Sequence, residues 1–449
     1  MPAEELILPW KGAGMKEFPV DSIRAQFPSL GVTDGERTRT YLDNPAGTQV
    51  PQRVSDAIAR FFKTSNANLG GYFSTSIAAG DVMFSALRAL AVFVGASSER
   101  EIVVGPSMTS LTYTFSRSLG RMFGRGDELI VTRMDHDGNI SPWLAMAQER
   151  GAVVRWLPFD QDTWRIEPEA LDAVLSDRTR LLALNYASNL TGSINDVRAL
   201  SAKARQAGAL VYVDAVQYAP HRLIDAPSLG CDFLTCSAYK FYGPHLGVLW
   251  GREDVLHELY AYKVRPLTDT LPERFEVGTP QLELLAAATA TIEHFEWIGN
   301  LFGSGADRRA RIAMAFDALC AWESELARRL IDGLTALPGV TIRGISDAAQ
   351  LHLRVPTVSF THSSCPSAEI ARRLAGLGIF VWSGHNYALE IARSLALDEE
   401  DGVVRIGLAQ YNTPQEIDKT ISALSALLAP HSEHHAVSAR QAEGSLSTN

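Results

Sequence analysis

Three short, almost unbroken apolar segments constrain the fold of this chain more than any other feature. Segments 128–132, 180–185 and 210–214 consist largely of leucine, isoleucine, valine and alanine. Short apolar runs without polar alternation are typical of strands that are buried on both faces, as in a parallel sheet. Stretches of helical period lie between them, at 167–175 and 197–208. This alternation predicts an α/β fold, in which helices flank a mostly parallel sheet and right-handed crossovers join its strands.

A second, smaller unit follows in the C-terminal part of the chain. After a long helical stretch at 282–297, segments 351–360 and 378–382 have the composition of strands in an α+β unit. The last helix has a clear start, because the sequence from Thr413 to Glu416 combines a capping box with proline at the first helical position. A chain of 449 residues is long enough for two domains.

These patterns place a domain boundary near residue 290. We expect a large domain over 36–290, a smaller C-terminal domain over 291–429, and an N-terminal segment, 1–35, associated with the smaller domain. The polar tail 430–449 contains His434 and His435, and we expect it to be disordered rather than to bind a metal. The sequence predicts no metal site.

Polar residues follow each of the three predicted strands. Asp135 and His136 come after the first, Ser188 and Asn189 after the second, and the third ends in Asp214, with Gln217 close behind. In open α/β sheets, ligands bind beyond the carboxyl ends of the strands. The sequence therefore predicts a ligand site at this edge of the sheet.

Lys240 carries the chemistry that the sequence predicts for this site. It follows the strand that ends in Asp214, and small and aromatic residues surround it. A single lysine is usually a solvated surface charge, but a positioned amine can form a Schiff base with a carbonyl cofactor. An acid such as Asp214 can hold a pyridine nitrogen in its protonated form. The pair predicts pyridoxal 5'-phosphate (PLP) as the cofactor.

Composition argues against several other kinds of protein. The formal net charge of −10 argues against a nucleic-acid partner. None of the four cysteines has CxxC spacing, and we expect Cys231 and Cys236 to be buried beside a strand. The apolar runs look too short to cross a membrane, and the N-terminus lacks the pattern of a secretory signal. We therefore expect a cytoplasmic protein without a membrane partner.

With these motifs in view, residues 41–428 resemble the class V aminotransferase family of fold-type I PLP enzymes, and most of all its cysteine desulfurase and selenocysteine lyase branch. The resemblance implies a seven-stranded sheet in the large domain. It also implies that Lys240 forms the Schiff base and moves the α-proton, that Asp214 pairs with the pyridinium nitrogen, and that Gln217 contacts the phenolic oxygen of the ring. His136 would stack on that ring.

The resemblance further implies a phosphate site where the segment 105–110 opens a helix. Thr109 matches the phosphate-binding threonine of the family, Met108 would offer its backbone N–H, and Ser237 matches a phosphate-contacting serine. Tyr239 stands where the nearest relatives have histidine, and its hydroxyl could donate to the phosphate.

Two further matches imply an active site shared between subunits and a binding group for the substrate carboxylate. The segment with Gly278 and Thr279 resembles one that reaches the phosphate of the neighbouring subunit, so the resemblance implies a homodimer with shared active sites. Arg405 matches the arginine that binds the substrate α-carboxylate, which a guanidinium can hold with two hydrogen bonds. Asn189 matches the family asparagine near the phenolic oxygen and the substrate carboxylate.

The sequence departs from the desulfurases at the sulfur acceptor. Their catalytic cysteine lies on a mobile loop, and in the matching stretch, 382–389, Tyr387 stands at or beside its position, two residues after His385. A phenol with a pKa of about 10 cannot accept sulfane sulfur as a thiolate does. Segment 66–75 also lacks the arginine and histidine of close desulfurases. We therefore predict that no persulfide forms.

These features predict an enzyme that acts at the α-carbon of a small-molecule amino acid. Our leading hypothesis is a β-eliminating lyase that cleaves a C–S bond, with Lys240 as the base. Transamination stays open, as does epimerisation with Tyr387 or His385 as the second proton donor. A non-catalytic PLP-binding protein is the alternative of another class, and the intact set of site residues argues against it: Lys240, Asp214, His136 and Arg405.

Overall fold

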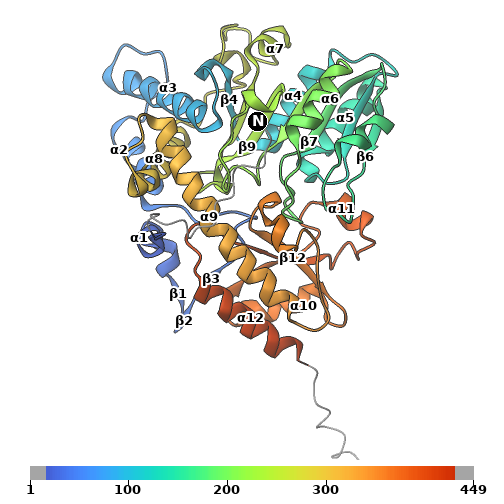
Figure 1. The fold of residues 1–449 in the computed structure, drawn as a ribbon. Coiled ribbons are helices and arrows are strands. Elements are labelled where there is room, and N and C mark those ends of the chain that lie inside the picture. Colours follow the sequence, from blue (N-terminus) through green and yellow to red (C-terminus); the bar gives the residue numbers. More distant parts are fainter. Residues whose placement is uncertain (1–16, 430–449) are drawn as a thin grey trace, which may run out of the picture.

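The computed structural model describes residues 17–429, and a seven-stranded sheet forms the centre of its larger domain (Figure 1). Residues 1–16 and the predicted tail 430–449 lie outside this range. The strands follow the order β4-β10-β9-β8-β7-β5-β6. Five neighbouring strands, from β9 to β6, are parallel, and β10 is antiparallel to β9 and β4. The bounds are β4 (Ile102–Gly105), β5 (Glu128–Thr132), β6 (Val153–Leu157), β7 (Thr179–Asn185), β8 (Leu210–Asp214), β9 (Phe233–Ser237) and β10 (Gly247–Gly251).

This sheet confirms the predicted α/β fold, and β5, β7 and β8 are the three apolar segments of the sequence. Successive side chains point to opposite faces, so each strand contributes to two cores. Ile130 belongs to the core that is covered by α3 (Ser74–Val94), α6 (Val197–Gln206) and α8 (Leu282–Phe302). Leu129 and Val131 belong to the core under α4 (Met108–Gly120) and α5 (Ser141–Arg150). Burial on both faces explains why these strands carry no polar alternation.

The smaller domain contains an antiparallel sheet with the order β11-β12-β15-β14. Its core side chains come from this sheet, from α10 and α12, and from the second half of α9. The bounds are α9 (Arg308–Thr335), β11 (Val340–Ile342), β12 (Thr357–His362), α10 (Ser367–Gly376), β14 (Trp382–Gly384), α11 (Leu389–Ser394), β15 (Val403–Gly407) and α12 (Pro414–Leu428). The predicted start of α12 is confirmed, because Thr413 and Glu416 form a capping box around it.

The described part of the N-terminal segment contacts both domains. Phe18 stacks on Trp322 of α9, and Arg24 forms an ion pair with Glu416 of the smaller domain at 3.1 Å. Strand β3 then pairs in parallel with β13 of the smaller domain. The remaining bounds are α1 (Val20–Arg24), β1 (Thr33–Asp34), β2 (Arg37–Thr38), β3 (Thr40–Tyr41), α2 (Gln52–Thr64), α7 (Glu253–Glu258) and β13 (Ile379–Phe380).

The predicted boundary at residue 290 lies inside α8, which runs without a break and packs against the large domain. The change from one core to the other occurs along α9. Its first half, with Phe316 and Leu319, belongs to the large-domain core, and its second half, with Leu326 and Leu330, belongs to the small-domain core. Figure 1 shows α9 crossing from one domain to the other.

Two predicted elements differ in the structure. The segment 167–175 forms a 3-10 helix, Pro168–Ala173, rather than an α-helix, because Leu171 is its one buried residue and a short turn suffices to bury it. The segment 351–360 does not start as a strand. It ends a 3-10 helix, Ala348–Leu353, and the ladder begins at Thr357, because Pro356 cannot donate a ladder hydrogen bond.

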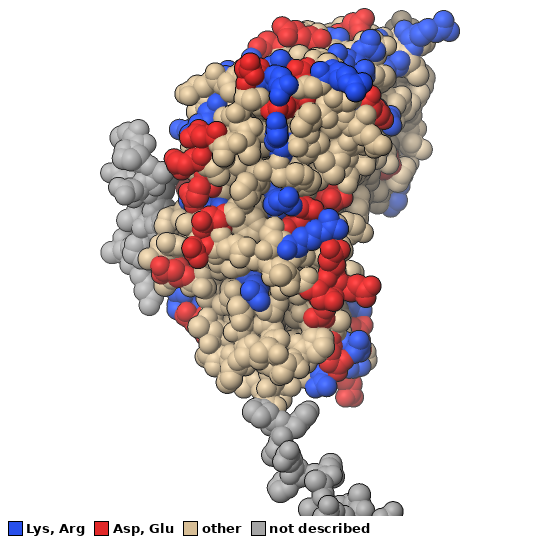
Figure 2. Space-filling view, turned by 90° about the vertical axis from the view of Figure 1, so that its right-hand side faces the viewer, with Lys and Arg blue, Asp and Glu red and all other residues tan. Residues whose placement is uncertain are grey.

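Helix α3 corrects the expectation that every apolar run is too short for a membrane. Its 21 residues are apolar enough, by length and composition, to span one. In the structure, half of its most apolar window is buried, and Leu87 and Leu90 pack into the large-domain core. On the molecular face drawn in Figure 2, acidic and basic side chains are intermixed.

Candidate active site

The carboxyl ends of β7, β8 and β9 meet the start of α4 around a cavity. Nearly all the residues that the sequence predicts for the cofactor line this cavity. They are Met108, Thr109, His136, Asn189, Asp214, Gln217, Ser237, Tyr239 and Lys240. Ser107, Asn185, Ala187 and Val216 complete its lining. The expected edge of the sheet therefore does bring these side chains together.

Lys240 lies directly after β9, in the short 3-10 helix Ala238–Lys240, and its side chain is buried. Its Nζ donates a hydrogen bond to the carbonyl oxygen of Pro45. The Nε2 of Gln217 donates to the same oxygen at 2.7 Å. Burial, reinforced by the charge of Arg405, lowers the pKa of Lys240 to about 7, although Asp43 and Asp214 oppose the shift. A substantial fraction of this amine is therefore neutral, and nucleophilic, at physiological pH.

Asp214 ends β8 and is buried opposite the lysine. Its Oδ1 accepts a hydrogen bond from the backbone N–H of Val216 at 2.8 Å. Burial raises the pKa of Asp214 to about 6, while the Val216 N–H and the charge of Lys240 act to lower it. A carboxylate in such a place is stabilised by a cation, and a protonated ring nitrogen would provide one.

His136 is held as a neutral ring at the wall of the cavity. Its Nδ1 accepts a hydrogen bond from the backbone N–H of Gly138 at 2.9 Å. Burial, together with the charges of Lys240 and Arg405, lowers the pKa of His136 to about 4. A neutral, flat side chain in this position is suited to stacking on an aromatic ligand.

The start of α4 is built to receive an anion. Ser107 caps the helix by accepting a hydrogen bond from the N–H of Ser110 at 3.1 Å, and Met108 and Thr109 lie in the first helical turn, where backbone N–H groups have no partner within the helix. Two glycines allow the surrounding chain to come close. A Cβ on Gly247 would lie 2.3 Å from the carbonyl carbon of Ser107, and one on Gly138 would lie 2.9 Å from Thr109 Oγ1.

Ser237 and Tyr239 complete this end of the cavity. The Ser237 side chain is buried at the end of β9. The ring of Tyr239 stacks on His245, with 4.7 Å between ring centroids. Backbone N–H groups and hydroxyls at a helix start match the needs of a phosphate.

Arg405 connects the two domains at the other end of the site. It lies in β15 and is buried. Its Nη1 donates to the carbonyl oxygen of Asn189 at 3.1 Å, and its Nη2 lies 3.4 Å from Oδ1 of Asp43. The side-chain Nδ2 of Asn189 in turn donates to the carbonyl oxygen of Asn386 at 2.7 Å. Arg405 Nε and Asn189 Oδ1 are buried and lack partners, so this end of the site has hydrogen-bonding capacity left for a ligand.

The loop with His385 and Tyr387 lies beside His136. The ring centroids of Tyr387 and His136 are 5.5 Å apart. The backbone N–H of Tyr387 donates to Nδ1 of His385 at 3.0 Å. The carbonyl oxygen of Tyr387 accepts a hydrogen bond from the backbone N–H of Asp137 at 2.7 Å. Tyr387 therefore faces the site from the smaller domain.

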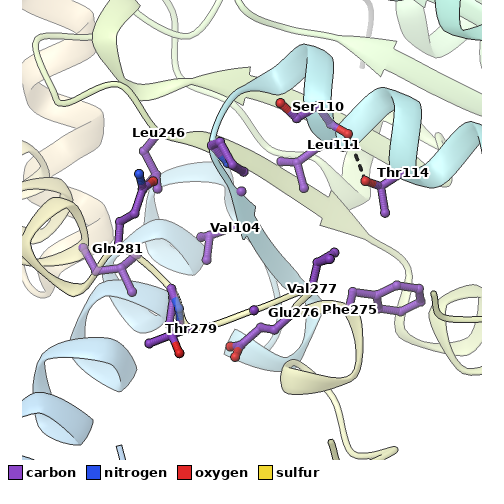
Figure 3. A pocket seen from close by; sticks show the side chains of 15 residues that line it. Val104, Ser110, Leu111, Thr114, Leu246, Phe275, Glu276, Val277, Thr279 and Gln281 are labelled. Atoms are coloured by element: carbon purple, nitrogen blue, oxygen red, sulfur yellow. Dashed lines mark hydrogen bonds between the residues drawn. The ribbon is translucent and has the colours of Figure 1, made fainter. Parts of the chain in front are cut away.

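Gly278 and Thr279 do not line the cavity that contains Lys240. Both are exposed, and they line a separate cavity between the segment 275–281 and α4 (Figure 3). Figure 3 shows Thr279 and Glu276 across this cavity from Ser110 and Thr114. Within one chain, the predicted phosphate contact of Thr279 is therefore not made.

Sequence reasoning missed two groups that contact the key side chains. Asp43 pairs with Arg405, and the carbonyl oxygen of Pro45 accepts hydrogen bonds from both Lys240 and Gln217. The signal for Asp43 was present, because this acid directly follows the short apolar pair Tyr41-Leu42. Every residue has a backbone carbonyl oxygen, so the sequence does not indicate that the one of Pro45 accepts these hydrogen bonds.

PLP fits this set of residues. The buried lysine could hold its aldehyde, Asp214 its ring nitrogen, His136 one face of its ring, and the start of α4 its phosphate. The side-chain amide of Gln217, which also lines the cavity, could donate to its phenolic oxygen. Each chemical feature of the cofactor therefore has a matching group in the cavity.

The comparisons with known proteins agree with this geometry. The profile of the family described as aminotransferase class-V matches residues 40–420. The chain is 34% identical to the aminotransferase-like protein FGM3 of Gibberella zeae, over 92% of this chain and 99% of that protein. It is 30% identical to a cysteine desulfurase of Pectobacterium atrosepticum, over 91% of this chain and 98% of that protein.

Among solved structures, the cysteine desulfurase CsdA from Escherichia coli matches with a TM-score of 0.79 and 26% identity. The match covers 92% of this chain and 99% of that one. The cysteine desulfurase of Thermococcus onnurineus matches with a TM-score of 0.81 and 25% identity, over 92% and 98% of the two chains. The predicted fold type and cofactor are thereby confirmed. This chain is a PLP-dependent enzyme that belongs to the class-V aminotransferase family.

Proposed function

We propose that the protein is a lyase that removes the α-proton of an amino acid and expels a β-substituent, cleaving the C–S bond of a cysteine derivative. One observation carries this proposal. The loop that faces His136 presents Tyr387, and none of the four cysteines, all of which lie within the described residues, lines the cavity. Without a thiolate at the site, the sulfur leaves with its substituent rather than as a persulfide on the protein.

Lys240 is the base in this reaction. When bound, PLP supplies an electron sink for bonds at the α-carbon. The buried amine of Lys240, with its pKa lowered to about 7, takes the α-proton. The β-sulfur departs as a thiol or sulfenate with the electron pair of the C–S bond, and water then releases the remaining three-carbon fragment as pyruvate and ammonium. No outside oxidant or reductant is required.

Arg405 positions the substrate for this step. Its guanidinium is buried, and its Nε is unpartnered. A carboxylate placed there forms charge-assisted hydrogen bonds with a buried guanidinium. Asn189 holds the guanidinium from the large domain through its carbonyl oxygen.

The direct test is an assay of the PLP-loaded protein with cysteine S-conjugates and their sulfoxides. We expect stoichiometric pyruvate and ammonium from the native protein, and a rate at least about 1000-fold lower from the Lys240→Ala variant, because general acid–base and covalent catalysis are both removed. Lys203→Ala, which removes a partly exposed lysine of α6 that pairs with Asp172, is the matched control. Absence of pyruvate with every conjugate would refute the lyase.

Transamination is the second candidate, since the relative FGM3 is described as aminotransferase-like. It uses the same lysine but leaves the β-substituent in place. The same incubations decide between the two, because a transaminase yields the substituted keto acid and leaves the cofactor in its amine form.

We further propose a homodimer in which Thr279 of one subunit reaches the phosphate site of the other. Gly278 and Thr279 are exposed and do not line the cavity that contains Lys240 in their own chain, and Val277 beside them is 63% exposed. Sedimentation equilibrium of the purified protein should give about twice the chain mass of 48.9 kDa. A mass that stays at one chain across micromolar concentrations would contradict the shared site.

A further inference from the structure

Three aromatic side chains border the substrate end of the site, and we refer to Trp382, His385 and Tyr387 as the aromatic rim. Trp382 is 55% exposed and Tyr387 is 68% exposed. The rings of His385 and Tyr387 lie 6.1 Å apart in an edge-to-face arrangement. Large aromatic groups gathered at the entrance of a site offer apolar area and stacking faces to a ligand.

Strand pairing places Trp382 next to the carboxylate-binding group. Trp382 in β14 pairs directly with Arg405 in β15, so the two side chains lie on the same face of the small-domain sheet. The Arg405 side chain contacts Asn189 and Asp43 on that face. Trp382 therefore flanks the position of the substrate carboxylate.

The other side of Arg405 is closed. There it pairs with Ser359 of β12, and the Ser359 Oγ donates to the carbonyl oxygen of Leu190 at 2.6 Å in a buried contact. On the β14 side, the next residue on the same face is Gly384, which has no side chain to fill the space. The Trp382 side of Arg405 is therefore open to solvent, and the Ser359 side is buried.

The backbone of the loop that carries Tyr387 is held against the large domain. Two hydrogen bonds tie this loop to the large domain, from Asn189 Nδ2 to the Asn386 carbonyl oxygen and from the Asp137 N–H to the Tyr387 carbonyl oxygen. Asn386 and Tyr387 both have positive φ, at 54° and 58°, which costs energy for residues with a side chain. Such a conformation persists where the surroundings hold it, and here it presents the Tyr387 ring beside His136.

We infer that the aromatic rim selects the β-substituent and that the substrate is a cysteine S-conjugate whose sulfur carries a flat aromatic or heteroaromatic group. The inference rests on the proposed lyase function, because that function supplies the C–S bond. With its carboxylate on Arg405, such a substrate directs its aromatic group between Trp382 and Tyr387. The aromatic rim cannot stack on a methyl group. A preference for the aromatic substrate therefore comes from the ring on its sulfur.

The test compares S-phenylcysteine with S-methylcysteine on the PLP-loaded protein. The absorption change of the cofactor on adding each amino acid gives a Kd that does not depend on which bond later breaks. We expect tighter binding of the phenyl compound, and a phenyl-to-methyl preference that falls roughly 3- to 10-fold in Trp382→Ala and in Tyr387→Ala, since one aromatic contact contributes about that factor.

Conservative variants and a remote control separate recognition from structure. Trp382→Phe and Tyr387→Phe should keep most of the preference, and Phe62→Ala, which removes another exposed aromatic side chain on α2, should leave it unchanged. Equal binding of the two compounds, or equal weakening of both in the alanine variants, overturns the inference. Selective binding without pyruvate would instead refute the lyase and leave the rim in place.

Discussion

Burial moves the pKa values of the two central titratable groups of the site, Lys240 and Asp214, toward neutral pH. It lowers the pKa of Lys240 to about 7 and raises that of Asp214 to about 6. In both cases the loss of solvent is the largest cause, and the opposite charge of the other residue resists the shift. The amine is therefore available as a nucleophile and base, and the acid gains most from a cationic ring nitrogen.

A stability measurement on the cofactor-free protein tests this burial. Between pH 7 and the ordinary lysine value of 10.5, the folded chain binds fewer protons at Lys240 than the unfolded chain does. The contribution of Lys240 to stability is therefore unfavourable at low pH and improves as the pH rises through this window. Lys240→Met should raise the free energy of unfolding by a few kcal/mol at pH 6, and the gain should shrink toward pH 10.

Chemical denaturation of both cofactor-free proteins across this pH range provides the check. Lys263→Met is a useful control, because its Nζ has a carbonyl partner at Leu267 and lies outside the site. A gain that is the same at pH 6 and pH 10 would show that Lys240 is not desolvated.

At the scale of elements, the start of α4 depends on the close approach of β10. A Cβ on Gly247 would lie 2.3 Å from the Ser107 carbonyl carbon and 2.6 Å from the Met108 backbone nitrogen, which is closer than atoms can come without displacement. Gly247→Ala should therefore push the helix start away and weaken PLP binding by about tenfold or more, with a smaller loss in overall stability.

Titration of the cofactor-free protein with PLP measures this effect. Gly80→Ala in α3 is the matched control, because nothing lies within 4 Å of its added Cβ and alanine favours a helix over glycine. If Gly247→Ala binds PLP as tightly as the native protein, the helix start is not the phosphate site.

The sequence predicts elements well where one local rule decides them. Strands β5, β7 and β8 were predictable because burial on both faces leaves a continuous apolar run, and α12 because its capping box is local. The two segments that form 3-10 helices were not predictable in this way. In each, a single residue, the buried Leu171 or Pro356, overrides the helix or strand pattern of the surrounding sequence.

At the scale of the whole molecule, the site depends on contacts that the sequence does not reveal. Pro45 accepts its hydrogen bond from Lys240, 195 positions later, and Asp43 meets Arg405 from the far end of the chain. The residue types at the site could be predicted from motifs. Their partners could not, because folding brings together segments with no shared local pattern.

The two domains share one site and one long helix. Arg405 and Tyr387 come from the smaller domain, Lys240, Asp214 and His136 from the larger, and α9 contributes to both cores. The hydrogen bonds from Asn189 to Asn386 and from Arg405 to Asn189 cross between them. Binding of a substrate carboxylate to Arg405 would therefore depend on the relative position of the two domains.

We predict that Lys240 holds PLP as an imine. Borohydride reduction of the PLP-loaded protein, followed by digestion and mass spectrometry, tests it most directly, because reduction turns the imine into a stable amine. We expect a pyridoxyl group on the peptide that contains Lys240, and none in the Lys240→Ala variant. A pyridoxyl group on any other lysine, or unlabelled native protein, would contradict it.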